Sequence, residues 1–316
     1  MDFVHPPPEL VPFGLRALKM VASADGTFGA EERNLLAAAQ ALFGTHVDLD
    51  ALEPIEPAEL AARIETPALR RQLVRAMIVL SMADAEIDPR ESEVVDRFAE
   101  ALGESSPHVA TLRHMADKQL LAVRFDLVRR FWVREKAVET LRARGLGWAV
   151  RTMITLLGMK EDDAIANRYR ALEHAPPGSL GKTYFDAMRA HGFSLPGEKG
   201  SPPEFIVLHD LTHVLSGYDV DPEGEVQVLA FHAGCRREEK DPFAFVMFGL
   251  ASFQLDMNPS PIVKGSKGKL DPELFLRALE RGARCTIDPT DGWDPWSVMN
   301  EPVDALRKRY GITPLG

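Results

Sequence analysis

Residues 20–36, MVASADGTFGAEERNLL, decide the fold of this chain, because residues 79–95, VLSMADAEIDPRESEVV, repeat them without a gap. The alignment pairs equivalent residues as follows: Asp25 with Asp84, Phe28 with Ile87, and Glu32 with Glu91. Each copy is an apolar helix end, an acidic turn and an acid-rich helix start, and carboxylates favour helix N-termini. The repeat therefore predicts two similar helical hairpins.

The acidic turns also look like the second half of a calcium-binding EF-hand loop. The first and third ligand positions of such a loop, however, would be Val21 and Ser23 in one copy and Leu80 and Met82 in the other. These side chains cannot supply the carboxylates that calcium needs, so capped helix starts are favoured. With its acidic turns, the repeat resembles the TerB-like helical domains of tellurite-resistance proteins.

Composition sets limits on the class of protein. The 316 residues carry a net charge of -10, which argues against generic nucleic-acid binding. Cys235 and Cys285 are the only cysteines, so no disulfide framework is expected and a reducing cytoplasm suits the chain. Helical periodicity dominates and strand-type alternation is scarce, so the predicted class is all-α with two helical domains, residues 1–155 and 156–316.

Membrane contact is expected to be peripheral. The N-terminus, MDFVHPPPEL, has no signal-peptide pattern, and the most apolar stretch, residues 242–257, is too short to span a bilayer. Residues 124–151 carry eight basic and three acidic residues on a pattern of apolar helical spacing. Such a basic amphipathic helix could lie on an anionic inner-membrane surface. The alternative is that the helix packs against the acidic N-terminal domain, and this is favoured because aromatics at helical spacing usually form core.

Residues 209–225, HDLTHVLSGYDVDPEGE, have the spacing of a metal site. Residues four apart on a helix lie about 40° from each other, so His209 and His213 present both imidazoles to one point. Asp210 is rotated by about 100° and reaches the metal from the flank or supports a histidine. Gly217 is expected to end this helix, and Glu225, at the start of the next one, can swing a carboxylate onto the ion. Two neutral imidazoles and two carboxylates would balance the charge of one divalent ion.

Two other metal-dependent classes use similar spacings. A zincin needs Glu at the position of Asp210 as its general base, so that class fails here. A phosphohydrolase of the HD type uses a His-Asp dyad with distant ligands, and His191, Asp256 and Asp288 are candidates for them. The HD alternative stays open.

The pattern formed by His209, Asp210, His213 and Glu225 resembles the signature of the coenzyme Q biosynthesis protein 4 family. Two further segments are similar to that family: PPGSLGKTYFDAMRAHGFSLPG (176–197) and WDPWSVMNEPVDALRKRYGI (293–312). The similarity runs from Arg168 to Ile312, about half the chain. One departure is His232, which stands where the family commonly has a glutamate.

The resemblance implies a mainly helical domain that holds a prenylated aromatic ring precursor at one divalent metal ion, zinc or iron. The implied activity is oxidative decarboxylation at ring C1 in ubiquinone biosynthesis. The alternative is a lipid-binding scaffold for the other biosynthesis proteins, with the apolar segment from Phe243 to Leu255 lining a channel rather than forming a core helix. A homo-oligomer is compatible with either function.

Overall fold

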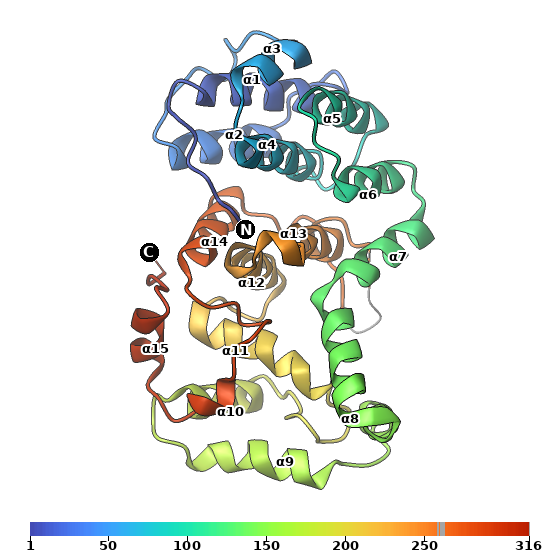
Figure 1. Ribbon diagram of the computed structural model, residues 1–316, viewed down its shortest axis with the longest axis vertical. Coiled ribbons are helices and arrows are strands. Elements are labelled where there is room, and N and C mark those ends of the chain that lie inside the picture. The colour runs from blue at the N-terminus through green and yellow to red at the C-terminus, as the bar shows by residue number, and fades with distance from the viewer. Residues whose placement is uncertain (258, 260–262, 316) are drawn as a thin grey trace. The chain divides into compact units, whose positions relative to one another are not determined.

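The computed structural model describes residues 1–257, 259 and 263–315. Within these residues the chain forms helices and isolated β-bridges without a strand, which confirms the predicted all-α class (Figure 1). None of the described helices is long and apolar enough to cross a membrane. The chain divides into two compact units, Met1–Arg130 with Val220–Ala283 and Phe131–Asp219 with Arg284–Gly316. Each unit thus combines two stretches of sequence, and the domain boundary near residue 155 stays a prediction.

The first unit contains the repeat and a later group of helices. Its elements are α1 (Val11–Ala22), α2 (Ala30–Leu42), α3 (Pro57–Arg63), α4 (Pro67–Leu80), α5 (Pro89–Ala101), α6 (Pro107–Ala116), α7 (Leu120–Arg130), α12 (Pro222–Cys235), η3 (Glu238–Lys240), α13 (Phe243–Gly249), η4 (Leu250–Gln254) and α14 (Pro272–Arg284). Every residue of α13 and of the π-helical turn η4 is buried, so the apolar run after residue 242 forms core.

The second unit carries the paired histidines. Its elements are α8 (Trp132–Leu156), α9 (Asp163–Arg170), η1 (Ala171–His174), α10 (Leu180–Ala190), η2 (Glu204–Ile206), α11 (Val207–Ser216), η5 (Pro295–Ser297) and α15 (Val303–Arg309). α11 contacts both α10 and α15, so two other segments of the sequence hold the helix that presents the histidines.

The two predicted hairpins are α1–α2 and α4–α5, and their turns have matching hydrogen bonds. The Asp25 carboxylate accepts from the Thr27 N–H at 2.7 Å, and Asp84 accepts from the Glu86 N–H at 3.0 Å. Both second helices then begin with a capping box, because a glutamate three residues into each helix start bonds back to the chain. These carboxylates serve the turns and the helix starts, as the sequence predicts.

The capping glutamates of the two copies, Glu32 and Glu91, are both buried, and their carboxyls lie close enough to shift each other's pKa. Burial raises the pKa of Glu32, and it raises the pKa of Glu91 to about 9 with help from the charges of Glu32 and Asp84. The sequence alignment of Glu32 with Glu91 therefore corresponds to a contact in space. At neutral pH one proton stays on this pair.

A pH dependence of stability follows from the raised pKa of Glu91. The folded state binds this proton more tightly than the unfolded chain, so the stabilisation is full below the ordinary carboxyl pKa and is lost as pH rises toward 9. A Glu91→Gln substitution keeps the capping box and removes the titration, so we expect it to raise the free energy of unfolding at pH 8 by about 1–2 kcal/mol. Urea titrations between pH 5 and 9 measure this effect. Glu93→Gln, on the exposed face of α5, is the control; equal pH profiles for both variants would contradict the explanation.

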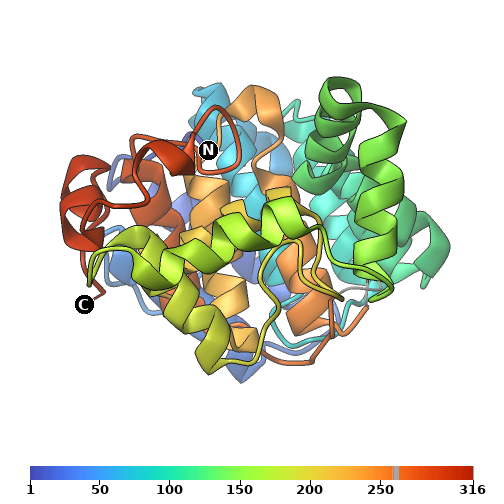
Figure 2. The ribbon, with the colours of Figure 1, turned by 90° about the horizontal axis from the view of Figure 1, so that it is seen from below.

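Residues 124–151 form two helices instead of the single amphipathic helix expected. Phe131 separates α7 from α8, and Gly145 inside α8 has φ 72° and ψ 179°, which breaks α8 into two arms (Figures 1 and 2). Phe131 and Trp132 are buried, as expected of aromatics at helical spacing, whereas Val128 is exposed. A glycine is required at the break because other residues rarely adopt a positive φ.

Candidate metal centre

α11 begins and ends as its sequence predicts. Gly217 follows its last turn with φ 84°, and the Gly217 N–H donates to the His213 carbonyl at 2.8 Å. The sequence predicts that the next helix starts at Glu225, but α12 starts three residues earlier, at Pro222. The Asp221 carboxylate caps this earlier start by accepting a hydrogen bond from the Gly224 N–H at 2.7 Å. Glu225 consequently lies in the first turn of α12.

The two histidines point the same ring atom at each other. Their Nε2 atoms are 3.3 Å apart, their ring centroids are 4.8 Å apart and the rings are nearly perpendicular, at 88°. Two nitrogens bound at about 2.0–2.1 Å to one tetrahedral ion are about 3.3–3.4 Å apart. The pair therefore has the separation that a shared metal ion needs.

The other nitrogen of His213 fixes the orientation of its ring. Nδ1 lies 3.1 Å from the backbone carbonyl oxygen of Tyr218, which can only accept a hydrogen bond. The proton is therefore on Nδ1, and the lone pair of Nε2 is directed toward His209. Metal-binding histidines in proteins are held in this way by a carbonyl or a carboxylate behind the ring.

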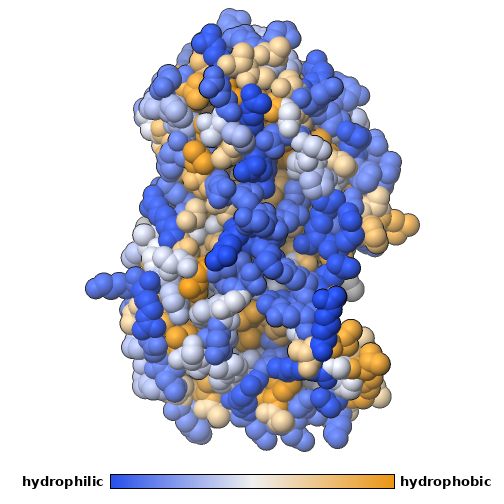
Figure 3. All heavy atoms as spheres, viewed as in Figure 1, coloured by the Kyte–Doolittle hydropathy of each residue, from blue (hydrophilic) through white to orange (hydrophobic). Residues whose placement is uncertain are grey.

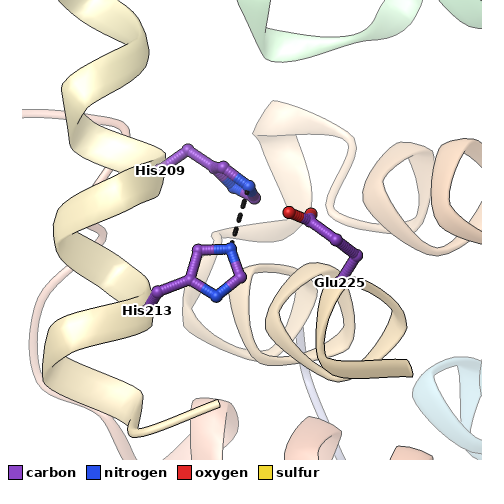
Figure 4. Close-up of side chains that lie close together, drawn as sticks. All are labelled: His209, His213 and Glu225. Atoms are coloured by element: carbon purple, nitrogen blue, oxygen red, sulfur yellow. Dashed lines mark hydrogen bonds between the residues drawn. The ribbon is translucent and has the colours of Figure 1, made fainter. Parts of the chain in front are cut away.

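Glu225 completes a cluster of three ligand-type side chains. One ligand atom each from His209, His213 and Glu225 lies within 4.8 Å of the others. Figure 4 shows the Glu225 carboxylate pointing toward the imidazole pair. Only the short turn from Gly217 to Asp221 separates α11 from α12, so the cluster comes from residues close in sequence. A set of nitrogen and carboxylate ligands, without cysteine, is typical of sites that keep a position open for water or substrate.

Asp210 lies outside this cluster of three. It is half-buried in the first turn of α11, and its charge acts on the buried phenol of Tyr184 in α10. Burial is the main cause that raises the pKa of Tyr184, and the Asp210 carboxylate raises it further. A role for Asp210 as metal ligand stays a prediction.

The distant ligands expected of an HD-type site do not join the cluster. His191 ends α10, where its Nδ1 atom lies 2.9 Å from the Ala187 carbonyl oxygen. Asp288 accepts from the N–H and the hydroxyl of Thr290 at 2.8 and 2.7 Å, and Asp256 lies in the loop after η4. His232 is a buried residue of α12 whose ring stacks on Phe245, with centroids 5.0 Å apart.

Arg307 is a supporting residue whose role the sequence did not reveal. Its guanidinium donates from Nε to the Leu215 carbonyl at 2.9 Å and from Nη2 to the Val214 carbonyl at 3.0 Å. These carbonyls belong to the last turn of α11, which has no helical N–H partners for them. The C-terminal segment thus fixes the end of the histidine helix. The unpaired carbonyls at the end of a helix were the available signal that some donor must lie there. The sequence could not identify Arg307 as that donor, because it is more than 90 residues away.

The segment at residues 176–197 joins the same scaffold. Ser179 caps α10 by accepting from the Lys182 N–H at 3.3 Å. The N–H groups of Leu180 and Gly181 donate to backbone carbonyls of Glu301 and Met299 at 2.9 and 2.8 Å. A side chain on Gly181 would come within 3.1 Å of the Met299 carbonyl oxygen, so glycine allows this close approach. The segments at residues 176–197 and 293–312 are therefore packed together with α11.

An aromatic cavity of about 160 Å³ lies at the start of α11 in the second unit. Its aromatic walls are Trp148, Tyr169, Phe205 and Trp296, and Leu208, the neighbour of His209 in sequence, also lines it. Thr140, Arg144 and Glu204 also line it, so the cavity combines flat aromatic walls, which suit a planar apolar group, with charged and polar side chains.

The fold and the cluster together define an all-helical protein with a candidate His/carboxylate metal centre. Residues 55–114, from α3 into α6, match the family model of tellurite resistance protein TerB. This match confirms the TerB-like resemblance in the N-terminal half of the chain and lies outside the metal cluster. Comparison with curated proteins gives no match.

Proposed function

We propose that this chain is a metal-dependent enzyme that acts on a prenylated aromatic ring precursor in ubiquinone-type biosynthesis. The supporting observation is the convergence of His209, His213 and Glu225 within segments similar to the coenzyme Q biosynthesis protein 4 family. His209, His213 and Glu225 would hold one divalent ion, zinc or iron, with Asp210 at its flank. The bound ion would supply positive charge for the carboxylate and phenolate oxygens of the substrate, and iron could also exchange electrons with oxygen.

The proposed reaction is oxidative decarboxylation at ring C1. The bond from C1 to the carboxylate breaks and carbon dioxide leaves, while a new bond forms from C1 to one atom of dioxygen. The second oxygen atom leaves as water, with two electrons and two protons from an external reductant. In this reaction the protein contributes position: the carbonyl of Tyr218 holds the His213 ring, and Arg307 holds the end of α11.

Turnover of a short-chain prenylated 4-hydroxybenzoate tests the proposal. We expect metal-loaded protein with labelled dioxygen and a reductant to release carbon dioxide and to place one labelled oxygen on the ring, as seen by mass spectrometry. Glu225→Gln is expected to lower the rate at least about 100-fold, because it removes an anionic ligand. Glu223→Gln, in the same helical turn and paired with Lys269 at the surface, is the matched control. Full turnover by Glu225→Gln, or none by metal-loaded wild type, would contradict the enzyme proposal.

A lipid-binding scaffold is the second candidate, and one observation favours it. The first unit contains an apolar cavity of about 140 Å³, with walls that include Leu18, Leu36, Leu73, Phe243 and Val246. A largely apolar cavity of this size can hold a benzene-sized group. A protein that binds a prenylated quinone, restores quinone synthesis in a deficient host and performs no chemistry alone would support the scaffold function, with other biosynthesis proteins as partners at the inner membrane.

A further inference from the structure

The second arm of α8 carries an apolar stripe on its exposed face. Leu146, Val150, Met153 and Leu157 are between 54% and 76% exposed. On a helix their spacing of four, three and four residues places them within about 40° of one line. The next exposed apolar residue, Met159, extends the stripe past the helix end at 69% exposure.

An ordinary surface helix turns polar residues to the solvent, whereas this arm turns its apolar stripe to the solvent. Trp148 and Thr155 are buried and lie about 180–200° from the stripe, so the arm already packs through the opposite face. In the cluster around Trp148, the ring of Phe205 lies 6.4 Å away, centroid to centroid. The exposed stripe is therefore not needed to attach the arm to its unit. Figure 3 shows apolar residues gathered over the end of α8.

α7, in the first unit, has the same character. Leu121, Phe125 and Val128 are 82%, 67% and 46% exposed, and their spacing places them on one line of the helix. Arg124 and Arg129 lie about 60° to one side and 80° to the other. The guanidinium of Arg129 lies 5.6 Å from the Phe125 ring centroid, and Asp126 is its carboxylate neighbour at 3.4 Å. Figure 3 shows a second gathering of apolar residues over α7.

Charge distinguishes this segment from the rest of the chain. Residues 124–151 carry eight basic and three acidic residues, a net charge of +5, in a chain whose net charge is -10. Several of the cations near the α8 stripe are exposed: Arg142, Arg144, Arg151 and Lys160. Arg144 pairs with Glu204 at 2.9 Å and Arg151 approaches Asp162 at 3.8 Å, so these two cations are partly neutralised.

We propose that α7 and the second arm of α8, each by its own apolar stripe, bind an anionic lipid bilayer. Apolar stripes with arginines beside them are the features by which interfacial helices bind: the apolar side chains enter the acyl boundary and the cations meet the lipid phosphates. A protein partner would have to offer an apolar surface with acidic groups beside it to each stripe separately, whereas an anionic membrane offers both properties everywhere. The inference is independent of the metal centre.

Flotation of the full-length protein with lipid vesicles tests this docking. We expect binding to phosphatidylcholine vesicles with about one quarter phosphatidylglycerol, weaker binding to phosphatidylcholine alone, and a loss between about 0.1 and 0.5 M salt. Leu146→Ser with Met153→Ser, and Leu121→Ser with Phe125→Ser, should each lower the partition coefficient at least about tenfold. The matched controls are Phe193→Ser and Leu274→Ser, single exposed apolar side chains elsewhere, for which we expect a change of less than about twofold.

A charge variant covers the case in which the serine variants fail to fold. Arg124→Gln with Arg129→Gln keeps the apolar side chains of both stripes and should lower the preference for anionic vesicles. Absence of binding to either vesicle would overturn the proposal. A second contradicting result would be a dimer in the absence of lipid, seen by light scattering, together with no vesicle binding. If the serine variants dissociated that dimer, the stripes would join two copies of this chain.

Discussion

Replacing His213 by alanine is expected to weaken the binding of zinc or ferrous iron at least about 100-fold. The substitution removes one of two imidazoles whose Nε2 atoms are 3.3 Å apart and leaves the Tyr218 carbonyl without its ring partner. A competition titration with a chromogenic chelator measures the affinity. The effect is expected to be large because two ligands that share one ion gain most of their affinity from being held together.

His191→Ala is the matched control for this titration. His191 is an exposed histidine at the end of α10, outside the cluster, and its ring lies against its own helix through the Ala187 carbonyl. Its replacement should leave the affinity within about twofold of wild type. Equal losses in both variants would mean that His191 helps to bind the same ion as His213, as an HD-type arrangement would require.

Gly282→Ala is expected to lower the free energy of unfolding by about 3 kcal/mol or more. α12 and α14 meet at Gly234 and Gly282, where a methyl group on Gly282 would collide with the backbone carbonyl of Phe231. A methyl group on Gly234 would be 2.6 Å from the Ala283 nitrogen, closer than any real contact. Backbone atoms on both sides leave no flexible side chain to move, so the helices would have to separate. Thermal and urea unfolding measure the change.

Gly147→Ala is the control for the glycine substitution. Gly147 also lies within a helix, but its added methyl group would meet only the end of the Arg151 side chain at 3.8 Å. Alanine is the better helix former, so this variant should be more stable by about 0.5–1 kcal/mol. If the Gly282→Ala protein were as stable as wild type, the α12–α14 contact would have to accommodate a methyl group, contrary to the close approach in the structure.

The helical class and several helix ends were predictable because they depend on local interactions. Gly217 stops α11 through its own positive φ, and the repeat places Glu32 and Glu91 at matching helix starts. The closeness of these two glutamates in space was not predicted, because equivalent positions of a repeat need not lie near each other. The break at Gly145 was not predicted, since glycine within a helical pattern signals either a tolerated residue or a break.

The parts that sequence did not predict depend on distant contacts. Residues Val220–Ala283 form one compact unit with Met1–Arg130, and periodicity in a single sequence carries no information on such pairing. The same is true of Arg307, whose hydrogen bonds to α11 join residues far apart in the chain. At the candidate site, helix geometry did predict the orientation of His209 and His213, because that depends only on their spacing of four residues.

Elemental analysis of the full-length protein, purified after loading with zinc or iron and removal of loosely bound metal, tests the central claim most directly. The claim is that His209, His213 and Glu225 hold one divalent ion. We predict one ion per chain for wild type and below about a tenth of an ion for His209→Ala, with unchanged helical content. No retained ion in wild type, or the same stoichiometry in His209→Ala, would contradict it.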